Sequence, residues 1–178
     1  MNDKTVWTIG HSTRSLEELV GLLHSFNITM LVDIRNYPGS RRYPHFNNED
    51  LEHSMPANAV GYLHLKELGG RRKPIEGSVN TAWRNTAFRG YADYMQTAEF
   101  KKAIDMLQVL AAKQPTAYMC SEAVWWSCHR SLVSDYLKWK GWTVMHIMDI
   151  RKTTEHPYSS AAKIVDRQLR YDKPDLFN

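Results

Sequence analysis

The chain has 178 residues, which is enough for one domain with a sizeable core and short for two. Its composition, 43% hydrophobic and 24% charged with no repeated or biased tract, excludes a disordered or fibrous protein. The net charge of +4 and the pI of about 9.0 favour an anionic partner, either a small molecule or a nucleic acid.

Three features predict where the protein resides. No apolar run approaches the ~20 residues needed to span a bilayer, so we expect no membrane association. The first residues lack the basic-then-apolar pattern of a secretory signal, and two cysteines do not make a disulfide framework. We therefore expect a cytoplasmic protein, and its aromatic residues leave room for a homodimer.

Short apolar segments alternate with helical patterns along the chain. Strands are predicted at 6–9, 29–32, 60–65, 116–119 and 143–147. A capping box formed by Ser15 and Glu18 predicts a helix that runs to Asn27. Further helices are predicted at 47–53, 92–113, 131–140 and 159–170.

This alternation predicts a single α/β domain over residues 1–178. We expect a mostly parallel, Rossmann-like sheet of five strands with helices on both faces. The long segment between the third and fourth strands is the natural place for the sheet to reverse direction, which predicts the spatial order 3-2-1-4-5. A partial barrel is the competing topology. The loops after the first and fourth strands would then face each other across a crevice.

Both cysteines lie in the loop that follows the fourth strand, where open α/β sheets place their ligands. If Ser127 caps the next helix, Cys128 lies in its first turn, where the helix dipole favours a thiolate. Cys128 is then a candidate nucleophile or redox thiol, and Cys120 is a candidate resolving partner. Simple core packing is the alternative for both, because free cysteines are often buried.

Three further residues are candidates for proton transfer. Glu122 stands beside the thiols, Asp33 ends a buried strand, and His11 follows the first strand. Each also has a purely structural interpretation, as an ion-paired or hydrogen-bonded side chain. Ser12, in the turn after Gly10, lies where a ligand would approach backbone N–H groups.

Basic side chains follow three of the predicted strands, and post-strand loops of a parallel sheet share one rim. We therefore expect them to converge on an anion, since guanidinium groups pair with phosphate or carboxylate oxygens. Tyr37 and Tyr43 would supply faces on which a base stacks. A solvated basic rim is the alternative. The candidate binding residues are Arg35, Arg41, Arg42, His64, Arg71, Arg72, His129 and Arg130.

A metal site would use Cys120, Cys128 and His129, with His11 or Glu122 as a further ligand. The eight-residue separation of the cysteines does not match the short paired spacing that zinc sites use. We predict no metal ligands on that ground, and no particular cofactor is indicated.

The ordered motifs resemble the DUF488 family along nearly the whole chain. The loop between the cysteines departs from the family pattern, because it holds Val124, Trp125 and Trp126 where a more polar segment is expected. The resemblance implies an α/β domain with a shared site and no particular reaction. The matching blocks are Thr8-Ile9-Gly10-His11-Ser12, Val32-Asp33-Ile34-Arg35 with Pro38, Ser40, Arg41 and Arg42, Tyr62-Leu63-His64-Leu65, Leu68-Gly69-Gly70, Cys120-Ser121-Glu122 and Cys128-His129-Arg130.

These observations predict an enzyme that acts on a phosphate-bearing substrate, either a nucleotide or a nucleic-acid element. Cys128 would attack or carry redox equivalents, and the arginines would hold the anion. A non-catalytic nucleotide-binding or nucleic-acid-binding module and a metal-binding protein remain the alternatives.

Overall fold

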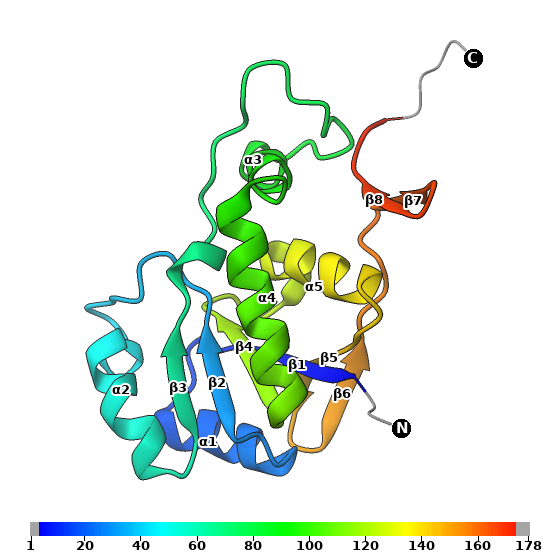
Figure 1. Cartoon of the computed structure of the whole chain (residues 1–178). Coiled ribbons are helices and arrows are strands. Elements are labelled where there is room, and N and C mark those ends of the chain that lie inside the picture. The colour runs from blue at the N-terminus through cyan, green and yellow to red at the C-terminus, as the bar shows by residue number, and fades with distance from the viewer. Residues whose placement is uncertain (1–3, 174–178) are drawn as a thin grey trace.

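Six short strands form the central sheet of the computed structural model, which describes residues 4–173 (Figure 1). Five of the strands are parallel, and the sixth returns antiparallel to the fifth as an edge hairpin. In spatial order the strands are β3 (Gly61–His64), β2 (Met30–Asp33), β4 (Thr116–Cys120), β1 (Thr5–Gly10), β5 (Thr143–Asp149) and β6 (Lys152–Glu155).

Helices cover both faces of the sheet, as predicted. Alternating side chains of each strand enter two separate cores: Tyr118 packs with the helices of one face, and Ala117 and Met119 pack with those of the other. The first face carries α3 (Thr86–Tyr94), α4 (Ala98–Lys113) and α5 (Arg130–Trp139), and the second carries α1 (Leu16–Ser25) and α2 (Asn48–Ala57). Short 3-10 helices are formed by Pro44–Phe46, Lys66–Leu68 and Trp125–Ser127.

The predicted strand order is wrong in one respect. β4 lies between β2 and β1, so β1 and β2 are not neighbours, although β1 and β4 are adjacent as predicted. The physical reason is burial: all five residues of β4 are buried, which suits the middle of a sheet covered on both faces. The sheet is open rather than a partial barrel, it has one strand more than predicted, and a Rossmann-like arrangement is not confirmed.

Helix boundaries differ from the predictions where caps were overlooked. The predicted helix at 92–113 is two helices, because Asn85 caps α3 and Thr97 caps α4 with its side chain. The capping box of Ser15 and Glu18 opens α1 as predicted. None of the helices within residues 4–173 combines the length and apolar character that crossing a bilayer requires.

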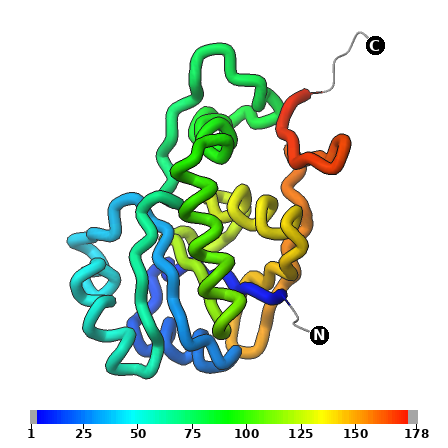
Figure 2. The backbone as a smooth tube through the Cα atoms, in the orientation of Figure 1, coloured from blue at the N-terminus to red at the C-terminus, as the bar shows by residue number. Residues whose placement is uncertain are grey.

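The predicted helix at 159–170 is wrong. That segment forms a two-stranded hairpin, β7 (Lys163–Val165) and β8 (Gln168–Arg170), whose turn residues Asp166 and Arg167 both have positive φ. Ser159, one of the two serines that could have capped such a helix, instead donates its backbone N–H and its hydroxyl to the carboxylate of Asp135. Figure 2 shows this C-terminal segment, orange to red, passing beside α5.

Asp135 is the polar centre that joins α5 to the C-terminal segment. Its carboxylate is fully buried and accepts hydrogen bonds from the ring of His156, the backbone and hydroxyl of Ser159, and the phenol of Tyr171. Because each of these donors is itself buried, the carboxylate satisfies groups that would otherwise lack a partner.

Replacing Asp135 by alanine should therefore destabilise the protein strongly. We expect the free energy of unfolding in urea to fall by about 3–5 kcal/mol, because several buried donors lose their acceptor at once. Asp105→Ala, which removes an exposed aspartate of α4, is the matched control and should change stability by less than ~0.5 kcal/mol. Equal losses in the two variants would contradict this role of Asp135.

Candidate functional site

A pocket of about 660 Å³ opens at the carboxyl ends of three neighbouring strands, β1, β4 and β2. The loops after these strands form most of its wall, and the loop after β3 and the start of α3 complete it. The predicted facing of the loops after the first and fourth strands is thus confirmed. The predicted site residues that line the pocket are His11, Ser12, Arg35, Arg42, Arg71, Cys120, Glu122, Cys128 and His129.

The two thiols lie side by side in the pocket wall. Cys120 is the last residue of β4, and Cys128 lies just before α5 in extended backbone, not in the first turn of the helix as predicted. The sulfur atoms are 2.8 Å apart, and both cysteines are free thiols. Ser127 does not cap α5, because its hydroxyl donates to the carbonyl of Val124. The Cys128 sulfur still accepts the backbone N–H of Arg130, 3.3 Å away.

Arg130 lies behind the thiols and does not reach the pocket. Its side chain is 2% exposed and donates from Nη2 to the carbonyl oxygens of Glu122 and Ala123, at 2.9 and 3.3 Å. Its Nε has no partner, and among residues 4–173 no carboxylate pairs with it. A buried guanidinium without a carboxylate requires some other negative charge nearby.

The thiol pair can supply that charge. Burial alone would raise the pKa of both thiols, but the hydrogen bond from Cys128 and the positive charge of Arg130 lower the pKa of Cys120 below its usual value. The same burial and the same hydrogen bond raise the pKa of Cys128 well above its usual value. When the pair loses its first proton, the negative charge therefore lies on Cys120 rather than on Cys128 as the sequence suggested.

His129 places an unprotonated nitrogen beside Cys128. Its Nε2 donates to the carbonyl of Ile34 at 3.0 Å, which leaves Nδ1 as the acceptor, 3.6 Å from the Cys128 sulfur. Burial, helped by the charges of Arg130 and Arg72, lowers the pKa of His129 to about 4. The imidazole is thus neutral at pH 7 and is held against the thiol.

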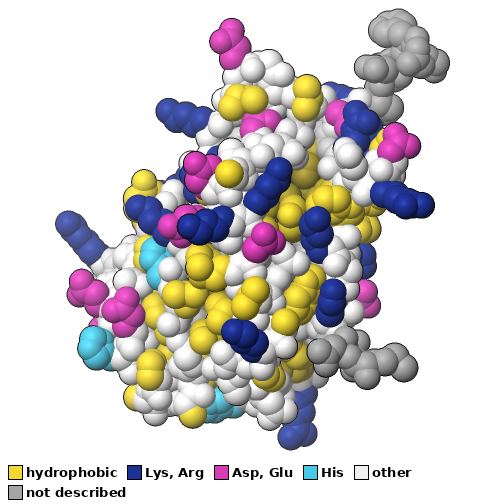
Figure 3. Space-filling model, viewed as in Figure 1, with side chains coloured by type: hydrophobic (Ala, Val, Ile, Leu, Met, Phe, Trp, Pro, Cys, Tyr) yellow, Lys and Arg dark blue, Asp and Glu magenta, His cyan; other side chains and the backbone are white. Residues whose placement is uncertain are grey.

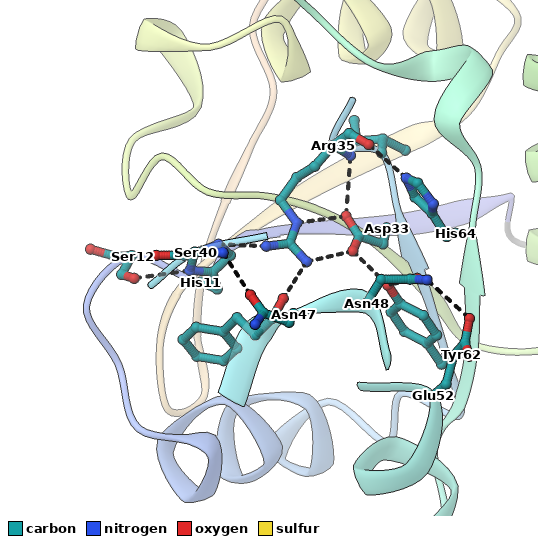
Figure 4. A network of polar contacts seen from close by, with 12 residues as sticks. His11, Ser12, Asp33, Arg35, Ser40, Asn47, Asn48, Glu52, Tyr62 and His64 are labelled. Carbon is teal, nitrogen blue, oxygen red and sulfur yellow. Dashed lines mark hydrogen bonds and ion pairs between the residues drawn. The ribbon is translucent and has the colours of Figure 1, made fainter. Parts of the chain in front are cut away.

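Asp33 and Arg35 form a buried ion pair in the floor of the site (Figure 4). Arg35 donates to both carboxylate oxygens of Asp33, from Nε at 2.8 Å and from Nη2 at 2.6 Å, and Nη2 also reaches the carbonyl of Phe46. The phenol of Tyr62 donates to the same carboxylate. Asp33 is fully buried and does not line the pocket, so its hydrogen bonds fit the structural interpretation better than proton transfer.

His11 lies between this ion pair and the loop after β1. Its Nδ1 donates to the carbonyl of Ser12 at 2.9 Å, and its Nε2 accepts from Nη1 of Arg35 at 3.1 Å (Figure 4). Burial and the charge of Arg35 lower its pKa to about 4. With both ring nitrogens engaged, His11 holds Arg35 in position and has no nitrogen free for a substrate proton.

Of the four other arginines predicted to bind an anion, two line the pocket and two do not. Arg42 and Arg71 are exposed in the pocket wall, each with its guanidinium near a tyrosine ring, Tyr43 at 5.5 Å and Tyr37 at 6.0 Å. Neither has a carboxylate partner within residues 4–173. Their position in the pocket and their lack of an ion pair make them the cations available to a bound anion.

Besides Arg130, three predicted binding residues lie outside the pocket wall. Arg41 is exposed, and the guanidinium of Arg72 stacks on the ring of Tyr94 at 3.7 Å. His64 donates from Nε2 to the backbone carbonyl of Arg35. Figure 3 shows that basic side chains are also scattered among acidic ones over the face that carries α4, so position rather than number distinguishes the pocket arginines.

A chain of buried polar side chains beneath the cysteine loop was not predicted. The hydroxyl of Thr8 bonds to His146, His146 bonds to His156, and His156 bonds to Asp135, at 2.7, 2.9 and 2.8 Å. The ring of Trp125 stacks on His146, and burial with the charge of His156 lowers the pKa of His146 to about 2. These residues come from separate elements, and no motif in the sequence connects them.

The metal interpretation receives no support from the geometry. Within the part of the chain that the structure describes, no three or more His, Cys, Asp or Glu side chains are grouped so that they could hold a metal ion. In particular, Cys120, Cys128 and His129 do not form such a group.

Comparison with known proteins identifies the family. Residues 15–137, more than half of the chain, match the family described as Domain of unknown function DUF488. The chain belongs to the DUF488 family. No curated protein and no solved structure matches it. The DUF488 match includes the loops after β2, β3 and β4, whereas the loop after β1 and the C-terminal hairpin lie outside the matched residues.

Gly10 determines how closely the loop after β4 approaches β1 in this DUF488 domain. A Cβ atom on Gly10 would overlap the backbone carbonyl of Glu122, the same carbonyl that accepts Arg130. Gly10→Ala should therefore displace the loop, lower the free energy of unfolding by about 2 kcal/mol and raise the thiol pKa. Urea unfolding and the pH dependence of alkylation measure both effects.

Gly39→Ala is the matched control, because Gly39 lies in the same pocket wall and its Cβ would have nothing within 4 Å. This variant should leave stability and thiol pKa unchanged. If Gly10→Ala also left the free energy of unfolding and the thiol pKa unchanged, the close contact between β1 and the cysteine loop would control neither of them.

Proposed function

We propose that this protein is a thiol-dependent enzyme that binds an anionic, phosphate-bearing substrate in the pocket at the carboxyl ends of β1, β4 and β2. The observation that carries the proposal is the contact between the thiols of Cys120 and Cys128, 2.8 Å apart in the pocket wall and in front of the buried Arg130. A thiolate is a strong nucleophile, and a buried positive charge nearby lowers the pKa of the thiol from which it forms.

Cys128 is the attacking sulfur in this proposal. It is 6% exposed, whereas Cys120 lies behind it at 1%. As Cys128 forms a bond to the substrate, its proton passes to the Cys120 thiolate, which is within hydrogen-bond distance. Nδ1 of His129, 3.6 Å from the Cys128 sulfur, is a second hydrogen-bond acceptor for the Cys128 thiol, but its pKa of about 4 leaves the proton transfer to Cys120.

The substrate is held by charge at the pocket mouth. Arg42 and Arg71 are exposed cations on the loops after β2 and β3, and guanidinium groups bind phosphate oxygens well. Glu122 is exposed in the same wall, where it could exchange a proton with a leaving group. Arg35 and His11 act as positioning residues, because their polar atoms are engaged with Asp33 and with each other.

A non-catalytic nucleotide-binding or nucleic-acid-binding module is the second candidate. Two arginine–tyrosine pairs at the pocket mouth favour it, since Tyr37 is 68% exposed and would offer a face to a base. In that case alterations of the cysteines would leave ligand binding unchanged, and only the loss of Arg42 or Arg71 would weaken it.

The thiol pair should lose its first proton below ~8.5, the ordinary pKa of a cysteine thiol. Alkylation by iodoacetamide, followed against pH by intact mass, measures this pKa. In Cys120→Ala, the pKa of the single remaining thiol, Cys128, should lie above the first pKa of the intact pair, because no second thiol is left to donate a hydrogen bond to the thiolate. Cys120→Ser, whose hydroxyl can still donate, should raise it less. A first pKa at or above ~8.5 in the unaltered protein would remove the nucleophile from the proposal.

Anion binding should depend on the two mouth arginines. With inorganic pyrophosphate as the probe in calorimetry, Arg42→Ala and Arg71→Ala should each weaken binding by roughly fivefold to tenfold, which corresponds to about 1–1.4 kcal/mol. Lys113→Ala is the control, since this exposed lysine ends α4 just before β4 begins, at the end of the strands away from the pocket. Unchanged affinity in both arginine variants would place the anion site elsewhere. A single-stranded oligonucleotide, titrated at several salt concentrations, tests the nucleic-acid alternative.

A further inference from the structure

The chain holds two cysteines, and the structure brings them into contact. They are eight positions apart in sequence, at the end of β4 and just before α5, and their sulfur atoms are separated by 2.8 Å. A disulfide bond is about 2.05 Å long, so oxidation would require the sulfur atoms to move by less than ~1 Å. Core packing alone does not need two thiols at hydrogen-bond distance in the wall of an open pocket.

The two thiols differ in their access to solvent. Cys128 is the more exposed of the two, and Cys120 is almost completely covered behind it. An incoming sulfur compound would therefore meet Cys128 first, with Cys120 in position to attack the resulting bond from within the protein. This order is that of an attacking thiol and a resolving thiol.

We propose that Cys120 and Cys128 form a two-electron dithiol–disulfide couple that exchanges with small disulfides bearing anionic groups. The inference deepens the proposed function, on which it rests for the recognition of the anion by Arg42 and Arg71. It assigns a reaction to the pair that does not depend on phosphate chemistry.

The exchange balances in two steps. The Cys128 sulfur passes its proton to Cys120 and attacks one sulfur of a disulfide R–S–S–R. A Cys128–S–S–R bond forms, the S–S bond of R–S–S–R breaks, and R–S⁻ leaves and takes the proton from Cys120. The Cys120 thiolate then attacks the Cys128 sulfur, so that the Cys120–Cys128 disulfide forms and the S–S bond from Cys128 to the bound R–S group breaks. A second R–S⁻ leaves and takes up the proton that the pair had released to water. The protein loses two electrons and two protons, and the disulfide R–S–S–R is reduced to two thiols.

The surroundings favour both steps. The charge of Arg130 stabilises a thiolate in the pair, and Nδ1 of His129 faces the Cys128 sulfur as a neutral hydrogen-bond acceptor. The carboxylates of a disulfide such as glutathione disulfide would meet Arg42 and Arg71 at the mouth of the pocket.

Glutathione disulfide is the probe for the experiment. The reduced protein is incubated with it at pH 7, quenched with N-ethylmaleimide in denaturant and weighed intact. Because the chain has two cysteines, the intact mass distinguishes three products. A dithiol carries two maleimide adducts, a mixed disulfide carries one glutathione and one maleimide, and an internal disulfide carries no adduct. We expect the unaltered protein to reach the internal disulfide.

Cysteine variants test the order of the two steps. Cys120→Ser should stop at the mixed disulfide, because Cys128 can be attacked only by an outside thiol once its partner is absent. Cys128→Ser should react at least ~tenfold more slowly, since the remaining thiol is 1% exposed. Arg42→Ala should slow the first step severalfold, whereas Lys113→Ala should not.

Two outcomes would overturn the inference. One is an unaltered protein that keeps both maleimide adducts or stops at the mixed disulfide. The other is a product that is a disulfide between two chains, visible as a dimer in a non-reducing gel. A lowered thiol pKa and pyrophosphate binding in the same protein would then show that the proposed function stands without the redox couple. An internal disulfide in a protein that binds no pyrophosphate would show that the redox couple exists and that the proposed binding of a phosphate-bearing substrate does not.

Discussion

The site depends on the buried positive charge of Arg130. A guanidinium removed from water is costly unless it is hydrogen-bonded and paired with an anion. Two carbonyl oxygens of the loop after β4 meet part of this requirement, and they also hold the loop in a fixed shape. The thiol pair is the neighbouring group that can carry the balancing charge, because the pKa of Cys120 is lowered in the field of Arg130. The shape of the loop and the ionisation of the thiols therefore both depend on Arg130.

The sheet order makes this arrangement possible. With β4 in the centre, its loop lies between those of β1 and β2, so that Arg35, His11 and the two thiols meet around one pocket. α5 then continues across the sheet with its first eight residues buried, and Asp135 lies in that stretch. The helix that presents Arg130 is held in place by the Asp135 network with the C-terminal segment. The C-terminal segment lies outside the residues that match the family, yet through its hydrogen bonds to Asp135 it helps to hold α5 in position.

Local patterns in the sequence predicted most of the elements, and long-range contacts account for what was missed. The capping box at Ser15, the apolar segment of β4 and the proximity of the loops after β1 and β4 are local or follow from parallel topology. The insertion of β4 between β2 and β1 depends on how helices pack over the sheet, which periodicity does not encode. Ser159 resembles a helix cap, but the buried carboxylate of Asp135 competes for its donors. Asp33 and Arg35 are two positions apart, yet spacing alone does not reveal that they bind each other.

Charge pairing also determines which cations are available to a ligand. Arg35 is neutralised by Asp33, and Arg130 is separated from the pocket by the thiols, so neither adds a free charge to the pocket floor. Within residues 4–173, Arg42 and Arg71 stay unpaired in the pocket wall, which places the selection of an anion at the mouth and the sulfur chemistry deeper inside. Oxidation of the thiols would remove the negative charge beside Arg130 and leave its guanidinium buried without a counter-charge. An excess of the oxidising disulfide therefore drives the pair to its internal disulfide, and the buried arginine makes that disulfide easy to reduce again, as a couple that turns over requires.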